Sequence, residues 1–324
     1  VCSSDLLHQY EETLRRGALN IKAQTKVIRN RTTTALLDAD RGLGHPVSVE
    51  AMEMAIKKAK SHDVGIVCVT NSHHFGAAGY YAELAAHQGL IGIVTTSTRG
   101  ISMVPTRGTQ PVLGTNPFAF AAPAGKYDPL VLDFATTVAA VNKVKVRKLR
   151  ELELPAGWVN DGDGRAVLDP NEAINIFNNK NWGGLNPVGG IGETLGGHKG
   201  YGLAIFSHIL SGAMSGASFS PIRVKNSNTD TPDDLGHYFQ AINPESFRTK
   251  EDYEADIEVV IETLRAVKPS DPEKHVLVPG EPEQISRKDR KKNGIPINRN
   301  LRNLIREIAR NANVEYLLEN ATIE

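Results

Sequence analysis

The feature that most constrains the fold is an alternation of strand-like and helix-like segments in the first third of the chain. Aliphatic and β-branched runs bounded by turn residues predict strands, and apolar residues that recur every three or four positions predict helices. In chain order the segments are 34–40 (strand), 49–59 (helix), 64–70 (strand), 79–88 (helix) and 91–96 (strand). Because strands that alternate with helices build layered sheets, the sequence predicts an α/β fold.

The remainder of the chain contains further strands and helices. Strands are predicted at 117–122 and 130–134, helices at 7–17, 202–216, 253–267 and 300–308, and a polar loop at 226–236. The segment Asn160–Gly164 has the composition of a calcium loop, but Arg165 and Ala166 stand where a ligand and a glycine belong. It is therefore predicted to be a turn, and the sequence predicts no metal site.

Composition excludes several classes of function. The 324 residues include 37 Lys and Arg and 37 Asp and Glu, so no excess of positive charge points to nucleic acid or to an anionic membrane. The apolar stretches are all broken well short of the roughly 20 residues that a membrane span requires. Two cysteines, Cys2 and Cys68, make no disulfide framework and suit a reducing compartment, so a cytoplasmic protein is expected.

Two polar motifs lie among the apolar segments. The first, Asn71–Tyr80, reads NSHHFGAAGY and joins a predicted strand to a predicted helix. A histidine flanked by small residues in such a turn has room for a ligand, and imidazole titrates near neutral pH. The alternative is that His73 and His74 bind only nearby backbone. The second motif, 112–117, places Asn116 at a turn, where its amide can bind a ligand or its own turn backbone.

A glycine-rich segment, Gly189–Gly202, precedes the helix predicted at 202–216. It lacks the G-K-[ST] ending of a P-loop NTPase, and it lacks the spacing of a Rossmann fingerprint. Backbone N–H groups at the start of a helix can nevertheless bind an anion, and Lys199 would add a full positive charge. The alternative is a solvated lysine beside a flexible loop.

Taken together, these motifs resemble the malate/L-lactate dehydrogenase family, which is distinct from the Rossmann-type lactate and malate dehydrogenases. The resemblance covers nearly the whole chain from about Leu7 and also rests on VLDFAT (131–136), GGIGET (189–194), GGHKGYG (196–202), VPGE (278–281) and NGIP (293–296). It implies an α/β architecture with a mixed, non-Rossmann sheet. It further implies a cofactor- and substrate-binding domain at 31–284 and a helical subdomain built from both chain ends, 7–30 and 285–324.

The resemblance also implies a function. The expected reaction transfers a hydride between NAD or NADP and a small 2-hydroxy acid/2-oxo acid pair, with malate or lactate as the expected substrate. Relatives within this family act on sulfolactate, ureidoglycolate or diketogulonate. A dicarboxylate would need a second cation, for which Arg107 is a candidate unless it is an ordinary loop arginine. The family commonly forms dimers, so a homodimer is expected.

Individual residues inherit expected roles from the same motifs. His74 matches the catalytic histidine of the family, whereas His73 is expected to be structural. The expected substrate-binding residues are Tyr10 and Asn116, and the expected cofactor-binding residues are Thr98, Leu132, Asp133, Phe134, Ala135, Lys199, Gly200, Pro279, Gly280 and Glu281.

The start of the chain departs from the family pattern. Residues 1–6 include no initiator Met and precede the resemblance, so they are expected to be a non-native extension of an N-terminally truncated protein. The family carries Ser-His-Gly and then Arg before a Tyr-containing helix. By spacing, Cys2 stands at the position of that histidine and Leu6 at that of the arginine, while Tyr10 matches the tyrosine. The alternative function is therefore a truncated, nicotinamide-cofactor-binding homologue without turnover.

Overall fold

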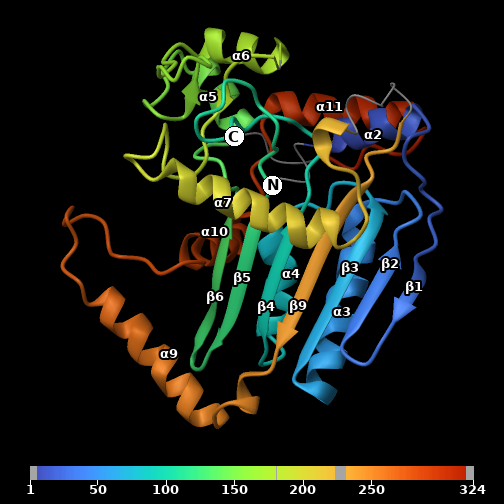
Figure 1. The fold of residues 1–324 in the computed structure, drawn as a ribbon, viewed down its shortest axis with the longest axis vertical. Coiled ribbons are helices and arrows are strands. Elements are labelled where there is room, and N and C mark those ends of the chain that lie inside the picture. Colours follow the sequence, from blue (N-terminus) through green and yellow to red (C-terminus); the bar gives the residue numbers. More distant parts are fainter. Residues whose placement is uncertain (1–5, 180, 223–230, 319–324) are drawn as a thin grey trace.

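The computed structural model describes residues 6–179, 181–222 and 231–318 (Figure 1). Of the expected extension 1–6 only Leu6 is described, and residues 226–230 of the expected polar loop also lie outside this part. The helices are α2 (Leu7–Arg15), α3 (Gly44–His62), α4 (Ala78–Ala86), α5 (Val141–Leu149), α6 (Pro170–Asn179), α7 (Gly197–His208), α9 (Lys250–Arg265), α10 (Glu281–Asn293) and α11 (Arg299–Asn311), with a π-helix at Ile209–Ala213 and a 3-10 turn at Pro244–Ser246. The strands are β1 (Lys26–Asn30), β2 (Thr34–Asp38), β3 (Val64–Ser72), β4 (Ile91–Thr96), β5 (Phe118–Ala124), β6 (Tyr127–Phe134), β7 (Val159–Asn160), β8 (Gly184–Leu185) and β9 (Leu235–Ile242). No helix in the described ranges has both the length and the apolar character to cross a bilayer.

Among the described residues, seven strands form one sheet in the order β1-β2-β3-β9-β4-β5-β6. Strands β2 and β3 are parallel, and every other neighbouring pair in the sheet is antiparallel. A doubly wound Rossmann sheet is mostly parallel, with a different strand order. The expected mixed-sheet, non-Rossmann α/β fold is therefore confirmed.

Strand β9 lies in the middle of this sheet, and the sequence does not predict it. It runs antiparallel to both β3 and β4, so that Phe239 is paired with Val67 on one side and Val94 on the other. Most of its residues are buried on both faces, and it carries His237 and Gln240. A doubly buried strand with polar side chains shows no alternation of apolar and polar residues, which is the signal that identifies strands in a sequence.

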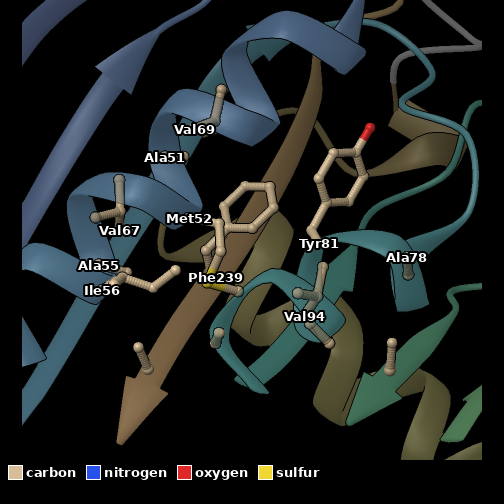
Figure 2. Packing of buried hydrophobic residues seen from close by; sticks show 14 of the residues in the cluster. Ala51, Met52, Ala55, Ile56, Val67, Val69, Ala78, Tyr81, Val94 and Phe239 are labelled. Carbon is tan, nitrogen blue, oxygen red and sulfur yellow. The ribbon is translucent and has the colours of Figure 1, made fainter. Parts of the chain in front are cut away.

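The largest hydrophobic core lies between the sheet and helices α3 and α4. Figure 2 shows Phe239 among Met52 from α3, Tyr81 from α4 and Val94 from β4. Two strand glycines bring the helices close to the sheet: a Cβ on Gly65 would lie 2.0 Å from the Ala55 carbonyl oxygen, and one on Gly92 would lie 2.4 Å from that of Ala82. Any larger residue at these positions would push the helices away from the sheet.

Helix α7 and the π-helix cover the upper part of the opposite face (Figure 1). The Thr95 hydroxyl donates to the Ser207 carbonyl, and a Cβ on Gly236 would lie 2.0 Å from the Ser211 carbonyl oxygen. The helix begins at Gly197, five residues before the expected start, because the glycine-rich segment itself forms the first turns. Beyond His208 it continues as π-helix instead of the expected α-helix.

The two chain ends meet where α2 and α11 pack against each other (Figure 1). Strand β1, within the segment 7–30, belongs to the main sheet and not to a helical layer. Helix α10 lies against β6, and its Arg287 forms a bidentate ion pair with Glu83 of α4 at 2.8 and 2.7 Å. The expected domain boundaries stay a prediction.

Strand directions bring several loops to one edge of the sheet. Strands β2, β3 and β4 are parallel to one another, since β9 is antiparallel to both of its neighbours, and β6 shares their direction. The carboxyl ends of these strands therefore meet the amino ends of β5 and β9 at the same edge, which is the upper edge in Figure 1. His73 and His74, which follow β3, and Asn116, which precedes β5, therefore lie at this edge.

A buried histidine stabilises the middle of this edge. The Nδ1 of His237 lies 2.7 Å from the Thr96 hydroxyl and its Nε2 lies 2.9 Å from the Ser72 hydroxyl, so its ring connects β9 to both neighbouring strands. The ring also stacks on Phe75 with centroids 4.6 Å apart. Burial lowers the pKa of His237 to about 3. The imidazole is therefore neutral in the folded protein at ordinary pH.

We expect acid to destabilise the fold through His237. Below pH 6.5, the ordinary pKa of imidazole, His237 becomes protonated in the unfolded chain. In the folded chain it stays neutral down to about pH 3. The contribution of neutral His237 to the free energy of unfolding is therefore complete above pH 6.5. It is lost as the pH falls, at up to about 1.4 kcal/mol per pH unit. Denaturant unfolding of wild type and His237→Gln between pH 7 and 4 should show a shallower pH dependence in the variant. Equal slopes would contradict this account.

Candidate active site

His74 and Tyr10 form the centre of the candidate site. The loop after β3 carries His74, and helix α2 places the Tyr10 hydroxyl 2.7 Å from its Nδ1. The backbone N–H of Gly76 points at the same nitrogen from 3.3 Å. Within the part of the chain that the structure describes, Nε2 of His74 makes no hydrogen bond. The ring is therefore oriented through one nitrogen, and the other can serve a substrate.

A second histidine, His45, completes an aromatic cluster that sequence reasoning missed. Its ring centroid lies 5.7 Å from that of Tyr10 and 6.4 Å from that of His74. Gly44 makes this approach possible, because a Cβ there would lie 2.4 Å from the His73 carbonyl oxygen. In the sequence, the signal nearest to this contact is the pair of glycines Gly42 and Gly44 at the start of α3.

His73 points away from this cluster into a buried ionic network. Its Nε2 lies 2.9 Å from the Ala18 carbonyl oxygen, and its Nδ1 lies 3.0 Å from Oδ2 of Asp233. The other carboxylate oxygen of Asp233 lies 2.9 Å from Nε of Arg99. These contacts agree with the structural role expected for His73, which stays a prediction, while Asp233 and Arg99 were not singled out from the sequence.

The surroundings of His74 favour its neutral form. Burial is the main cause that lowers its pKa below the ordinary value of 6.5. The nearby imidazole of His45 lowers the pKa further, and the carboxylate of Asp233 raises it in part. Because a proton acceptor must be unprotonated to work, this environment makes His74 a competent base near neutral pH.

A cavity of about 420 Å³ opens beside the aromatic cluster. Its lining is mostly apolar and comes from α3, the loop after β3 and the first turn of α4: His45, Pro46, Val49, Phe75, Gly76, Ala77, Tyr80 and Tyr81. An apolar cavity with a few polar groups at its wall is the usual shape of a small-molecule site.

Asn116 is buried, and its amide is engaged within the protein. Its Oδ1 accepts from the Thr98 hydroxyl at 3.0 Å, and its Nδ2 donates to the Ala204 carbonyl at 3.2 Å. Gly114 allows this turn to close, since a Cβ there would collide with the Thr98 side chain. These contacts place Thr98 and Asn116 together under α7 and account for the amide without a ligand. The expected substrate role of Asn116 stays a prediction.

Two of the segments expected to bind cofactor lie side by side at the free edge of β6. The N–H of Val131 donates to the Pro279 carbonyl at 3.1 Å, and Gly280, with φ of 97°, packs against Val131. Asp133 accepts from the Gly79 N–H at 2.8 Å and so caps the amino end of α4. The loop that carries His74 leads directly into this helix.

The remaining residues of these segments differ in their surroundings. Leu132 and Pro279 are exposed, and Phe134 and Ala135 are half-buried. The carboxylate of Glu281 is engaged by Nε of Arg265 at 2.9 Å and by the Val278 N–H at 2.6 Å, so this side chain shapes the turn.

Lys199 and Gly200 are connected to the β6 edge through Val188, which lies between Thr136 and Gly200. The Val188 N–H donates to the Thr136 carbonyl at 2.8 Å, and a Cβ on Gly200 would lie 2.3 Å from the Val188 carbonyl oxygen. Lys199 is exposed in the first turn of α7, and no ion pair holds it within the described ranges. The three expected cofactor segments thus form a continuous contact chain, whereas Arg107 is 79 % exposed and paired with Glu193.

The mixed sheet defines an α/β protein outside the Rossmann class, with a half-buried cluster of Tyr10, His45 and His74 beside a small-molecule cavity. Comparison with known sequences agrees with that class. The chain belongs to the malate/L-lactate dehydrogenase family, whose sequence model matches residues 5–306. It is therefore a dehydrogenase of hydroxy acids.

Similar proteins cover most of the chain. A malate dehydrogenase of Pyrococcus abyssi is 39% identical over 311 residues, which are 96% of this chain and 83% of the relative. An L-sulfolactate dehydrogenase of Methanocaldococcus jannaschii is 37% identical over 96% of this chain and 86% of its own. The crystal structure of malate dehydrogenase from Entamoeba histolytica superposes with a TM-score of 0.87 at 33% identity, covering 94% of this chain and 84% of that one.

We expect the pH profile of hydroxy-acid oxidation to report His74. The value of kcat/KM should rise to a plateau with an inflection below pH 6.5, because burial favours the neutral ring. His45→Gln removes a positive neighbour and should move the inflection to higher pH. Asp233→Asn removes a negative one and should move it to lower pH. Profiles that coincide, or that shift in the same direction in both variants, would contradict the assigned charges.

Proposed function

We propose that this dehydrogenase interconverts malate and oxaloacetate with NAD or NADP, using His74 as the group that moves the substrate proton. The observation that carries the proposal is the pair formed by Tyr10 and His74, in which Nδ1 is engaged at 2.7 Å and Nε2 is left for a ligand. Malate is preferred over lactate because malate dehydrogenases are among the relatives at 39% identity.

His74 would act through Nε2. In the oxidation direction, the neutral ring accepts the hydroxyl proton of the 2-hydroxy acid as the hydride leaves the same carbon. Acceptance at Nε2 requires the neutral tautomer that carries its proton on Nδ1. In this tautomer and in the imidazolium alike, Nδ1 donates to the Tyr10 oxygen, so the hydrogen bond that orients the ring persists in both protonation states. In the reduction direction, the protonated ring returns the proton to the carbonyl oxygen. The apolar cavity wall excludes water from this exchange.

The residues present fit a nicotinamide cofactor along the contact chain at the edge of β6. When bound, that cofactor supplies or accepts the hydride. We propose that Leu132–Ala135 and Pro279–Glu281 hold it by backbone and apolar contacts, with Gly280 allowing close approach. Lys199, at the amino end of α7, would provide the positive charge for a phosphate. Thr98 would contribute its hydroxyl nearer the substrate.

The proposal predicts opposite kinetic patterns for two variants. Purified protein should oxidise NADH or NADPH in the presence of oxaloacetate. His74→Gln should lower kcat by about 100-fold or more, since general acid–base catalysis contributes that much, with little change in the KM for cofactor. Lys199→Ala should raise the KM for cofactor several-fold and leave kcat within a few-fold.

Tyr10→Phe should give a kcat between those of the wild type and His74→Gln, because it removes the hydroxyl that orients His74 and keeps the aromatic ring. Turnover in the wild type that persists unchanged in His74→Gln would reject the proton-transfer role. Absence of turnover in the wild type with oxaloacetate, pyruvate and sulfopyruvate would reject the dehydrogenase proposal for this chain.

We also propose a homodimer formed through the outer face of α7 and the π-helix. Phe206, Ile209 and Met214 are 45%, 51% and 52% exposed and lie along one stretch of this surface. Large apolar side chains gathered in this way mark protein–protein contacts more often than isolated ones. Because α7 also carries Lys199, a partner on this face would border the cofactor segment.

Ile209→Glu tests this surface. A charge there should prevent an apolar contact, so the mass in solution should fall from twice 35.2 kDa to 35.2 kDa. Val259→Glu, at a 61% exposed position on α9, is the matched control and should leave the mass unchanged. Sedimentation equilibrium measures both. A wild type of 35.2 kDa, or equal masses in the two variants, would reject the interface.

A cytoplasmic location is part of the same proposal. Cys68 is free and buried in the core, and burial raises the pKa of its thiol to about 11. Such a thiol stays protonated and unreactive, as is common in proteins of reducing compartments.

A further inference from the structure

A buried carboxylate fixes an exposed guanidinium near the candidate active site. Asp233 is 10% exposed and binds Nδ1 of His73 at 3.0 Å and Nε of Arg99 at 2.9 Å. The Arg99 side chain is 55% exposed, so its guanidinium reaches the surface at the sheet edge. Its Nε is bound by the buried carboxylate of Asp233. Burying a carboxylate is costly unless it is paired, and among the described residues His73 and Arg99 both bind it.

Strand order explains why these groups meet. Arg99 lies three residues after β4, His73 directly follows β3, and Asp233 lies two residues before β9, which is between those strands in the sheet. Neighbouring strands are about 4.8 Å apart, so the loops after β3 and β4 begin about 10 Å apart. A side chain at the start of β9 can therefore touch both loops.

The same placement joins Arg99, through Asp233, to the loop that carries His74. His74 is the next residue after His73, and Asp233 is close enough to raise its pKa. Thr98, which precedes Arg99, is fixed by its hydrogen bond to Asn116. Arg99 is thus anchored at both its backbone neighbour and its own Nε.

We propose that Arg99 is a specificity-determining residue that binds the distal carboxylate of a dicarboxylic substrate whose hydroxyl or carbonyl group lies at His74. This inference rests on the proposed function. A guanidinium suits the task because its planar N–H donors can grip a carboxylate with two parallel hydrogen bonds and it stays charged at every relevant pH. Asp233 would act as a positioning residue, since it fixes the orientation of the guanidinium before the substrate arrives.

The test compares a dicarboxylate with a monocarboxylate that undergoes the same chemistry. Steady-state kcat/KM is measured for oxaloacetate and pyruvate in wild type, Arg99→Ala and Arg99→Lys, with Arg107→Ala as the matched control. Arg99→Ala should lower kcat/KM for oxaloacetate by roughly 10- to 100-fold, the range expected for loss of a charged hydrogen-bond partner. The value for pyruvate should change by less than about threefold.

Arg99→Lys should recover part of the oxaloacetate activity, because it keeps the charge and loses the fork. Asp233→Asn should lower the oxaloacetate/pyruvate ratio by mispositioning the guanidinium, and Arg107→Ala should keep the wild-type ratio.

Three results would overturn the inference. The first is a parallel fall for both substrates in Arg99→Ala with partial recovery of both in Arg99→Lys, which identifies a merely structural link. The second is an unchanged oxaloacetate/pyruvate ratio in Arg99→Ala. The third is a wild type that uses pyruvate as well as oxaloacetate. In each of these cases the dehydrogenase proposal still stands. A wild type without turnover on either substrate would reject both together.

Discussion

The insertion of β9 between β3 and β4 is the constraint on which the rest of the structure depends. Its backbone joins two strands that would otherwise not be neighbours, and its side chains serve both faces. Phe239 enters the core against α3 and α4, while Gly236 admits the π-helix on the other side. The spacing of the loops after β3 and β4, and therefore the separation of His73 from Arg99, follows from this one strand.

The three histidines at the sheet edge, His237, His73 and His74, differ in burial and in the groups that surround them. His237 is fully buried between two hydroxyl groups and stays neutral. His73 faces a carbonyl and a carboxylate, which fix the loop. His74 has a hydroxyl partner on one nitrogen and lies within the influence of both His45 and Asp233. Proximity of opposing charges leaves its pKa governed mainly by burial, which suits a base near neutral pH.

Local patterns predicted the layered α/β architecture, because the strands and helices of the first third carry clear periodicity. The mixed sheet and the family were predicted from the motifs, through their resemblance to known dehydrogenases. Strand β9 was missed because burial on both faces removes alternation, and the start of α7 was missed because glycines read as loop.

The pairing of Tyr10 with His74 follows from how α2 lies over the edge, and spacing alone cannot show it. His73, Asp233 and Arg99 come from three distant segments, and only the sheet order brings them together. In the same way, Asn116 looked available from its turn sequence, but its amide is engaged by neighbours that are remote in the chain.

The position of β9 in the chain also bears on biosynthesis. Val64 pairs with Ile242, so β3 and β4 leave the ribosome long before their shared neighbour exists. Until then each presents an unpaired edge, the kind of surface that recruits strands from other chains. These edges must therefore stay clear of strands from other chains until β9 has been synthesised. Folding rate and yield in the cell should be governed by how quickly a strand delivered late can enter a sheet begun early.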